Sequence, residues 1–250
     1  MNIGLYQSAA SLAALERWQD NVSQNITSAQ TTGFRKRTIE FSTETAGEIH
    51  PDSHAKPGHE AAGMPMVFPK TSAGVNFISG ETMPTRRELD VAIQGEGFFE
   101  VKLPDDTMAY TRSGEFRLRP DRTIVTASGL EVMSDGGAPF VLLPGGGTVT
   151  VNQDGTVYQG STSLGKLSVQ KFANTAALIP TAGSMFIAGA GAGMTAVEDP
   201  ELMQGYLEQS NVQPLREMVD LVIIARAYEA NQKMITTIDQ QMQKALEALG

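Results

Sequence analysis

Three histidines within ten residues are the side chains of this sequence best suited to bind a transition metal or to exchange protons near neutral pH. They are His50, His54 and His59, with Asp52 and Glu60 beside them. Imidazole and carboxylate are common zinc ligands, so the spacing raises the hypothesis of a metal site. Two prolines and a glycine interrupt any helix that would align these ligands. This segment could hold a catalytic metal, bind ions adventitiously as a loop, or serve as a solvated linker. We favour the linker and predict no metal ligands.

The other patterns that resemble catalytic motifs are incomplete. Gln94–Phe99 contains Gly-x-Gly without a third glycine or a P-loop lysine, so we predict a bulge or turn between strands. Gly145–Gly147 follows a proline and is also predicted to be a turn. The chain has no cysteine, which excludes thiol catalysis, disulfides and thiolate zinc sites. It also has no Gly-x-Ser-x-Gly elbow of a serine hydrolase. We predict no enzyme activity, no catalytic residue, no small-molecule substrate and no cofactor.

Composition limits the remaining classes of protein. The 250 residues are 41% hydrophobic, enough for a real core, and 25 Gly with 12 Pro indicate a turn-rich β portion. A net charge of −9 argues against a nucleic-acid partner. We interpret Arg35–Arg37 as the solvated end of a helix. No apolar run is long enough for a membrane span, and no cleavable secretory signal is visible, so the default expectation is a soluble cytoplasmic protein unless another export route operates.

The C-terminal region has the apolar spacing of an amphipathic helix. Its seam repeats every seven residues and is interrupted by one asparagine, which we interpret as a register-setting residue. We expect this seam to be buried against a partner, because apolar side chains are each worth about 1.5 kcal/mol or more on burial. The seam positions are Leu221, Ile224, Tyr228, Asn231, Ile235, Ile238, Met242, Ala245 and Leu249.

The N-terminal region, residues 3–32, is a second helix candidate with a less regular seam. Gly33 follows it and is expected to adopt positive φ and end the helix. Asn211 and Pro214 suit the first turn of the C-terminal helix. The N-terminal seam positions are Leu5, Leu12, Leu15, Val22, Ile26 and Ala29.

Between the helices the sequence changes character twice. Residues 35–80 are predicted to be a connecting segment, with a short strand at Val75–Ile78. Residues 81–200 contain β-type runs, and three turns there share an Asp followed two residues later by Thr, so we predict hairpins. The β-type runs are Phe98–Leu103, Ile124–Thr126, Thr148–Asn152 and Leu167–Phe172; the turns are 103–111, 118–126 and 151–159.

We therefore predict a discontinuous α+β fold. Residues 1–34 and 201–250 supply N- and C-terminal helices paired as a coiled coil, and a mainly antiparallel β domain at 81–200 is inserted between them. Apolar residues also lie off the seam, and they are expected to contact other chains. They are Leu215, Met218, Val222, Ile223 and Met234.

Five blocks in this order resemble the bacterial flagellar rod and hook family of axial proteins. The Ser-Gln before Asn25 departs from that family's usual Ala-Asn pair. The blocks are Asn25–Phe34, Leu89–Phe99, Tyr110–Phe116, Gln204–Val212 and Glu217–Ile235. Within the family the chain looks most like its proximal rod members, with the distal rod members next and hook-type members as a further alternative.

The resemblance implies a structural subunit of the basal-body rod, in the periplasm-spanning part of the flagellum. It implies export through the flagellar type III apparatus without a cleavable signal, and assembly with copies of itself and other rod proteins through the seam residues into a tube. That tube would transmit torque and conduct later subunits. A non-flagellar secreted binding module with a ligand surface on the β domain is the competing class, and it predicts a well-folded monomer with a pocket.

Overall fold

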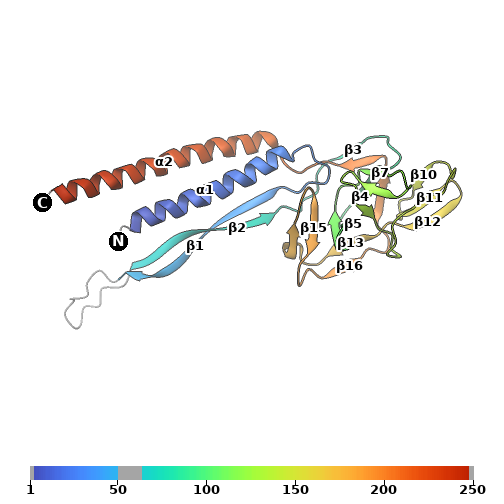
Figure 1. Cartoon of the computed structure of the whole chain (residues 1–250), viewed down its shortest axis with the longest axis horizontal. Helices are drawn as coiled ribbons and strands as arrows, with labels where there is room; N and C mark the ends of the chain where they lie inside the picture. Colours follow the sequence, from blue (N-terminus) through green and yellow to red (C-terminus); the bar gives the residue numbers. More distant parts are fainter. Residues whose placement is uncertain (1–2, 50–63, 248–250) are drawn as a thin grey trace. The chain divides into compact units, whose positions relative to one another are not determined.

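The computed structural model describes residues 3–49 and 64–247, which fold into two compact units (Figure 1). The helical unit contains the described parts of residues 1–26, 37–74 and 214–250, and the β unit contains residues 27–36 and 75–213. The fold is α+β, and the strand pairs of the β unit are antiparallel, as predicted. The histidine cluster at 50–59 lies outside the described residues.

In its described residues, the helical unit consists of two helices and a two-stranded sheet. Its elements are α1 (Ile3–Thr27), β1 (Arg37–Ile49), β2 (Met64–Val75) and α2 (Pro214–Glu247). At 1.5 Å per residue, α2 is about 50 Å long. None of the helices in the described part of the chain combines the length and apolar character that a membrane crossing requires.

The predicted connecting segment at 35–80 is wrong over its described strands, because β1 and β2 pair with each other there. The β-branched side chains of β1, such as Thr38, Ile39 and Thr43, favour a strand. Ile39, Phe41 and Thr43 alternate with polar residues in the sequence, as in a strand with one apolar face, although every described β1 position after Ile39 is exposed. The short strand predicted at Val75–Ile78 is also wrong: β2 ends at Val75, and residues 76–80 are irregular.

The helix ends follow local chemistry only in part. Pro214 begins α2, as its missing amide proton allows. Asn211 does not cap that helix; its side chain instead accepts from the Lys36 amide and donates to the carbonyls of Asn76 and Ile78. Gly33 has φ 67°, as predicted, but α1 ends earlier, at Thr27.

The β unit carries sixteen strands and a single 3₁₀ turn, η1 (Thr175–Ala177), over residues 75–213. They are β3 (Thr82–Pro84), β4 (Val91–Gln94), β5 (Phe98–Lys102), β6 (Met108–Thr111), β7 (Phe116–Leu118), β8 (Ile124–Thr126), β9 (Glu131–Val132), β10 (Val149–Val151), β11 (Thr156–Gln159), β12 (Thr162–Lys166), β13 (Val169–Phe172), β14 (Leu178–Pro180), β15 (Met185–Ala188), β16 (Met194–Ala196), β17 (Glu201–Gln204) and β18 (Tyr206–Glu208).

The largest sheet follows the order β14-β15-β6-β5-β9-β8-β7, with β13 pairing to both β5 and β16. A three-stranded sheet, β10-β11-β12, and the pairs β17-β4 and β18-β3 complete the unit. The residues 201–208, which were predicted to belong with the C-terminal helix, are thus strands of the β unit. Their partners β4 and β3 lie more than a hundred residues earlier in the sequence. A local sequence pattern cannot predict such a pairing.

The three predicted Asp-Thr hairpin turns are confirmed, and each has the same construction. Asp105, Asp121 and Asp154 accept a hydrogen bond from the amide two residues later, at 3.2, 3.0 and 3.1 Å. The residue after each Asp has positive φ: 64° at Asp106, 68° at Arg122 and 86° at Gly155. A left-handed residue at this point of the loop is a feature of the common three-residue hairpin loops.

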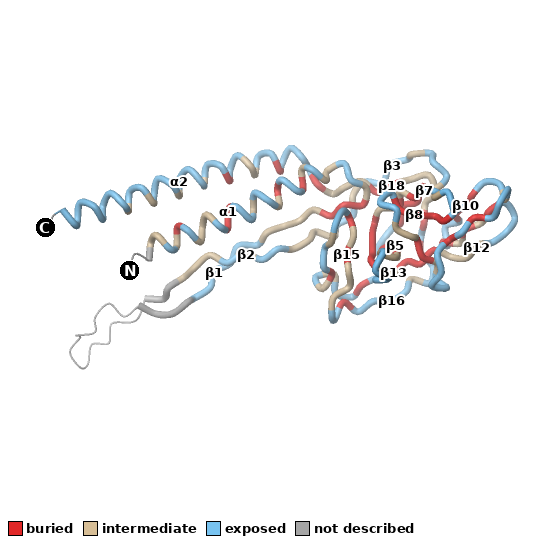
Figure 2. The backbone as a smooth tube through the Cα atoms, viewed as in Figure 1, coloured by how far each residue is buried: buried red, intermediate tan, exposed pale blue. Residues whose placement is uncertain are grey.

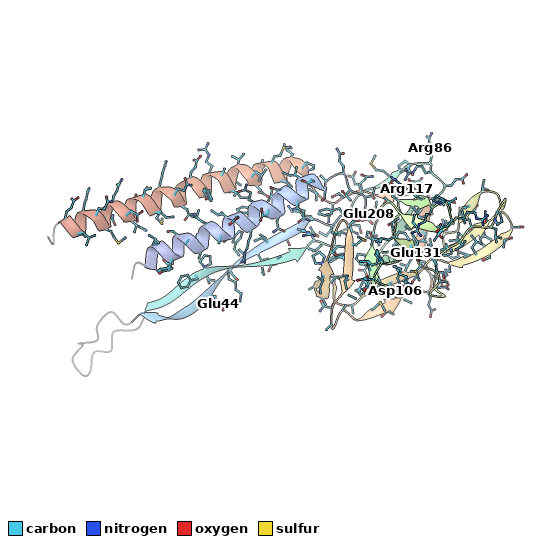
Figure 3. All side chains as sticks on the ribbon, in the orientation of Figure 1. Glu44, Arg86, Asp106, Arg117, Glu131 and Glu208 are labelled. Atoms are coloured by element: carbon cyan, nitrogen blue, oxygen red, sulfur yellow. The ribbon has the colours of Figure 1, made fainter. Side chains whose placement is uncertain are left out.

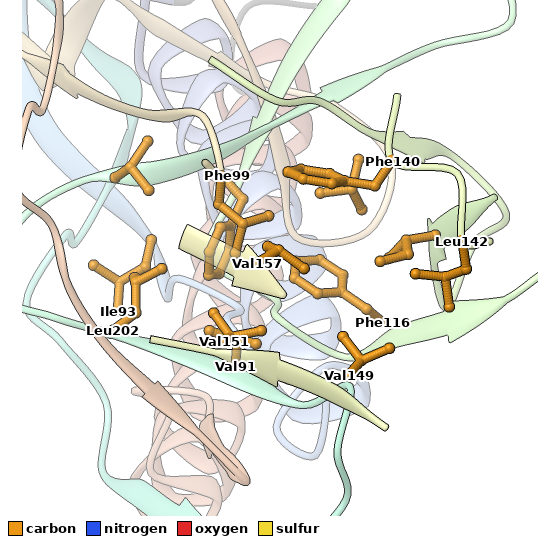
Figure 4. Packing of buried hydrophobic residues seen from close by; sticks show 14 residues of the cluster. Val91, Ile93, Phe99, Phe116, Phe140, Leu142, Val149, Val151, Val157 and Leu202 are labelled. Carbon is orange, nitrogen blue, oxygen red and sulfur yellow. The ribbon is translucent and has the colours of Figure 1, made fainter. Parts of the chain in front are cut away.

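The main core of the β unit is formed by side chains from strands far apart in sequence (Figure 4). Phe99 is fully buried and meets the Phe116 ring edge-on, with centroids 5.1 Å apart. Val157 and Leu202 pack into the same cluster from the three-stranded sheet and from β17. A fully buried side chain of this kind contributes about 1.5–3 kcal/mol, so this cluster is a major source of the stability of the unit.

Candidate assembly surface

The predicted seam of α1 is buried in its middle. Leu15 and Val22 are buried in a cluster that Trp18 and Ile26 also contact, whereas Leu5 and Leu12 are half-buried. Ala9, Ala10, Ala13 and Ala14 of the same helix are small enough to allow close approach by neighbouring elements. The seam position Ala29 lies beyond the end of α1.

Among its described positions, the predicted seam of α2 is buried only at Ile224, half-buried or exposed elsewhere, and exposed at the last two (Figure 2). Ile224 is 2% exposed and packs in the cluster of Leu15 and Val22, with Leu221 beside it. Tyr228 and Met242 are 41% and 44% exposed. Asn231, Ile235 and Ile238 are half-buried, Ala245 is exposed, and Leu249 lies outside the described residues. The structure therefore brings the two seams together around Ile224 and leaves the later described positions half-buried or exposed.

Asn231 bonds within its own helix. Its side-chain amide donates to the carbonyl of Ala227, 3.1 Å away. This is an i to i−4 contact of the kind that short polar side chains make on a helix. The observed bond therefore gives no support to the register-setting role predicted from the heptad.

The β1–β2 hairpin contacts α1 along its length. Gln7 donates to the carbonyl of Val67 at 3.1 Å, and Arg17 donates to the Thr71 hydroxyl at 3.0 Å. Trp18 meets Phe41 edge-on, with ring centroids 5.5 Å apart. Sequence reasoning missed this sheet, which takes part of the surface of α1 that a second helix would otherwise cover.

A buried polar contact joins three elements of the helical unit, and the sequence analysis did not identify it. The Asn25 side chain of α1 donates to a carboxylate oxygen of Glu217 at 2.9 Å, and both residues are buried. The same amide group exchanges hydrogen bonds with the backbone of Arg37 in β1. Glu217 lies one turn before Leu221, so an acidic residue on the apolar face of the helix was the available signal.

The first turns of α2 carry an exposed apolar surface, which we call the α2 patch. Val222 and Ile224 are two residues apart, about 200° around a helix, so Val222 faces away from the buried cluster. The members of the patch are Leu215, Met218, Val219, Val222 and Ile223, each between 48% and 77% exposed. Contiguous exposed apolar surface of this kind is typical of interaction sites.

The run Arg35–Arg37 is not the solvated helix end that the sequence suggested. Arg35 is buried in the β unit and donates to Glu208 of β18 at 2.5 Å (Figure 3 labels Glu208). Arg112 donates to the other oxygen of that carboxylate at 2.6 Å. Burial, and secondarily the nearby Arg112 charge, lowers the pKa of Arg35, against the opposing effect of Glu208. We call Arg35, Arg112 and Glu208 the buried triad.

Arg112 also fixes the predicted turn at 94–97. Its guanidinium donates to the carbonyls of Ile93, Gly95 and Gly97 at 3.0, 2.7 and 2.6 Å. Gly95 and Gly97 have φ of 89° and 137°, which other residues rarely adopt. The Gly-x-Gly pattern is therefore a turn whose carbonyl oxygens accept hydrogen bonds from the buried guanidinium of Arg112. A loop that binds phosphate would not hold a cation at its carbonyls.

Two family models match this chain and define its class. The description "Flagellar hook protein FlgE/F/G D1 domain" matches residues 92–159, within the β unit. The description "Flagellar basal body rod FlgEFG protein C-terminal" matches residues 203–248, from the last strands through α2. The α2 patch and the described seam positions of α2 thus fall in the segment that the rod-protein C-terminal model matches.

Similar proteins cover nearly the whole chain. It is 33% identical over 252 residues to the flagellar basal-body rod protein FlgF of Caulobacter vibrioides, covering 100% of this chain and 99% of that protein. It is 31% identical to FlgG of Borreliella burgdorferi, with 95% of each covered, and 30% identical to FlgF of Rhizobium meliloti, with 100% and 99% covered. The chain belongs to the flagellar basal-body rod protein family. None of these three relatives is named for a catalytic activity.

Proposed function

We propose that this protein is a structural subunit of the flagellar basal-body rod and that it assembles through its terminal helices. The observation that carries the proposal is the α2 patch: five apolar side chains stay exposed on the face of α2 that points away from its own unit. At about 25 cal/mol per Å² of apolar surface, covering that face on a neighbour stabilises an assembly. The partners are copies of itself and other rod proteins.

The geometry of the proposed contact favours a filament. A face of α2 that meets a different surface on the next copy makes a head-to-tail contact, and such contacts grow into helical polymers unless they close into a ring. The terminal helices, paired as a coiled coil, would form the tube, which would carry torque and conduct later subunits. The chain would reach this place through the flagellar export apparatus. Isolated helices are marginal in water, so their order depends on this packing.

Limited proteolysis with mass spectrometry tests the proposal on the purified monomer and on concentrated, assembled material. We expect cuts in α1 and α2 in the monomer, a resistant core near residues 75–200, and protection of both helices in the polymer. Helices that resist cleavage equally in both states would contradict assembly-coupled order. That result would favour the competing binding module with a ligand surface on the β unit.

We further propose that the protein occupies the proximal part of the rod, since the continuous block Leu89–Phe99 and the length of 250 residues resemble proximal members. Relatives named FlgF and FlgG both match, so the two positions need a direct test. Immunogold labelling of rods stripped of their rings should place this protein at the end opposite the hook. Label next to the hook would assign it to the distal rod.

A further inference from the structure

A cleft of about 510 Å³ opens into the β unit beside the buried triad. Arg35 and Arg112 line it, together with the rings of Phe77, Phe98 and Phe172. The three rings belong to one aromatic cluster. The ring centroid of Phe98 lies within 6.1 Å of the centroids of the other two. The cleft therefore combines rigid apolar walls with cationic groups, a composition typical of specific binding sites.

The charges that border this cleft do not balance. The buried triad contains two guanidinium groups and one carboxylate, so it carries one net positive charge. The Glu208 carboxylate is fully engaged, because it accepts from Arg35, from Arg112 and from the amide of Gly80 at 2.5, 2.6 and 2.9 Å. A buried charge without a counter-charge is costly, and a bound anion would relieve it.

Arg35 is the member with hydrogen-bonding capacity to spare. Both hydrogen bonds from its side chain come from Nη1, to Glu208 and to the carbonyl of Ile78. Its Nε is buried and lacks a hydrogen-bond partner among the described residues. The Nε and Nη2 edge of a guanidinium is a fork that matches the two oxygens of a carboxylate.

A second cation stands at the exposed side of the cleft. Lys171 of β13 lines the cleft and pairs with Glu96, which lines it too, at 2.5 Å. Both side chains are more than half exposed, at 55% and 76%. Exposed ion pairs are weak, typically worth less than about 1 kcal/mol, so an incoming carboxylate can compete with Glu96 for Lys171.

We propose that this cleft binds an acidic side chain from the stretch Glu198–Glu201 of a second copy of the chain. Charge complementarity supports this choice of occupant: the chain has 28 acidic residues against 19 basic ones. In this stretch Glu198, Asp199 and Glu201 are all exposed. Asp199 is paired only with Lys166 among the described residues, at 3.3 Å and with 90% of its side chain accessible. The proposal deepens the proposed function, because it names a contact between copies outside the terminal helices.

The test uses the full-length monomer, so it does not depend on polymer formation. The probe is the synthetic peptide Thr-Ala-Val-Glu-Asp-Pro-Glu-Leu, residues 195–202, acetylated and amidated, titrated by isothermal calorimetry at low salt. We expect saturable binding at one site. Binding should weaken at high salt, which screens exposed charges. A peptide with Gln, Asn and Gln in place of its three acidic residues should not bind.

Two surface variants probe the cleft without touching the buried triad. Lys171→Gln should weaken peptide binding by up to about fivefold, and Glu96→Gln should tighten it by a similar factor, because it frees Lys171. Unchanged circular dichroism controls for folding of both variants. Opposite shifts of the two variants are the signature of this cleft.

Three results would overturn the proposal. One is the absence of saturable binding to both the wild type and Glu96→Gln. Another is equal affinity of the wild type and the two variants, which would place the peptide elsewhere. The third is binding of free glutarate as tightly as the peptide, which would make the cleft a general carboxylate site rather than a contact between copies. Failure of the proposed function would appear separately, as monomer that does not polymerise.

Discussion

Replacing Glu208 with glutamine should strongly destabilise the β unit. Glu208 is 2% exposed and is the only carboxylate that pairs with Arg35 and Arg112 among the described residues. Glutamine keeps the shape of the side chain, but it leaves two guanidinium groups facing each other without a counter-charge. Its amide group also donates where the carboxylate accepted.

The size of the effect follows from the lost contacts. Hydrogen bonds to charged groups contribute about 1.5–3 kcal/mol each, and Glu208 accepts two from guanidinium groups. Breaking a buried ion pair by removing one partner costs about 3–5 kcal/mol, because a buried charge is left uncompensated. We therefore expect Glu208→Gln to lower the free energy of unfolding of the β unit by about 3–5 kcal/mol.

Hydrogen exchange with mass spectrometry measures this effect in the β unit alone. The amides of β5 and β6 lie in the largest sheet. Their exchange requires large-scale unfolding of the unit, so their exchange rates measure its stability. In Glu208→Gln they should exchange about a hundredfold to a few thousandfold faster, since each 1.4 kcal/mol is a factor of ten.

The matched control is Glu131→Gln, which removes a half-exposed partner of Arg119 at 3.3 Å. It should change exchange by no more than about fivefold. If Glu208→Gln accelerates exchange no more than this control does, then the buried triad does not stabilise the unit and the argument from burial is wrong.

Three further changes test local features. Gly33→Ala should lower the free energy of unfolding by more than about 2 kcal/mol, because a Cβ there would lie 2.3 Å from the Ser113 amide nitrogen and φ is 67°. Urea unfolding measures this loss, and a value under about 0.5 kcal/mol would contradict the close approach. Arg122→Gly should raise thermal stability slightly, by about 0.5 kcal/mol, since glycine adopts φ 68° without strain; a lower melting temperature would count against this. The Thr123 amide lowers the pKa of Asp121 from 3.8. The Asp121 carboxylate therefore stabilises the fold fully above that value, and this contribution disappears as pH falls through the lower folded-state pKa. Asp121→Asn should make the free energy of unfolding less dependent on pH in the acid range, and an unchanged dependence would refute this role.

Local features were predictable from the sequence. The Asp of each of the three hairpin turns accepts from an amide two residues away, so its chemistry is complete within a short peptide. The strand at Ile124–Thr126 was placed with its observed bounds for the same reason. The N-terminal proline of α2 is a third case, because proline at the first helical position needs no distant partner.

Long-range features were not predictable. Arg35 and Glu208 are 173 residues apart, and an arginine in a basic run gives no sign that it will be buried. The β1–β2 pair was missed although Ile39, Phe41 and Thr43 alternate with polar residues, because the Pro- and Gly-rich composition between the two strands indicated a connecting segment. Heptad spacing identified Ile224 as a buried contact, but it also placed Tyr228 and Met242 in the seam, and these two side chains are exposed in the described part of the unit. Periodicity indicates which face is apolar, and the neighbours decide how much of it is covered.

The central claim is that neighbouring subunits cover the α2 patch in an assembly, and cysteine labelling tests it most directly. The chain has no cysteine, so Val222→Cys provides a single thiol at a position that is 59% exposed. The thiol should react with a maleimide in the monomer, be protected in the polymer, and react fully again when the polymer is dissolved in urea. Equal labelling of monomer and intact polymer would show that the patch stays open to solvent, and assembly through this face of α2 would be wrong.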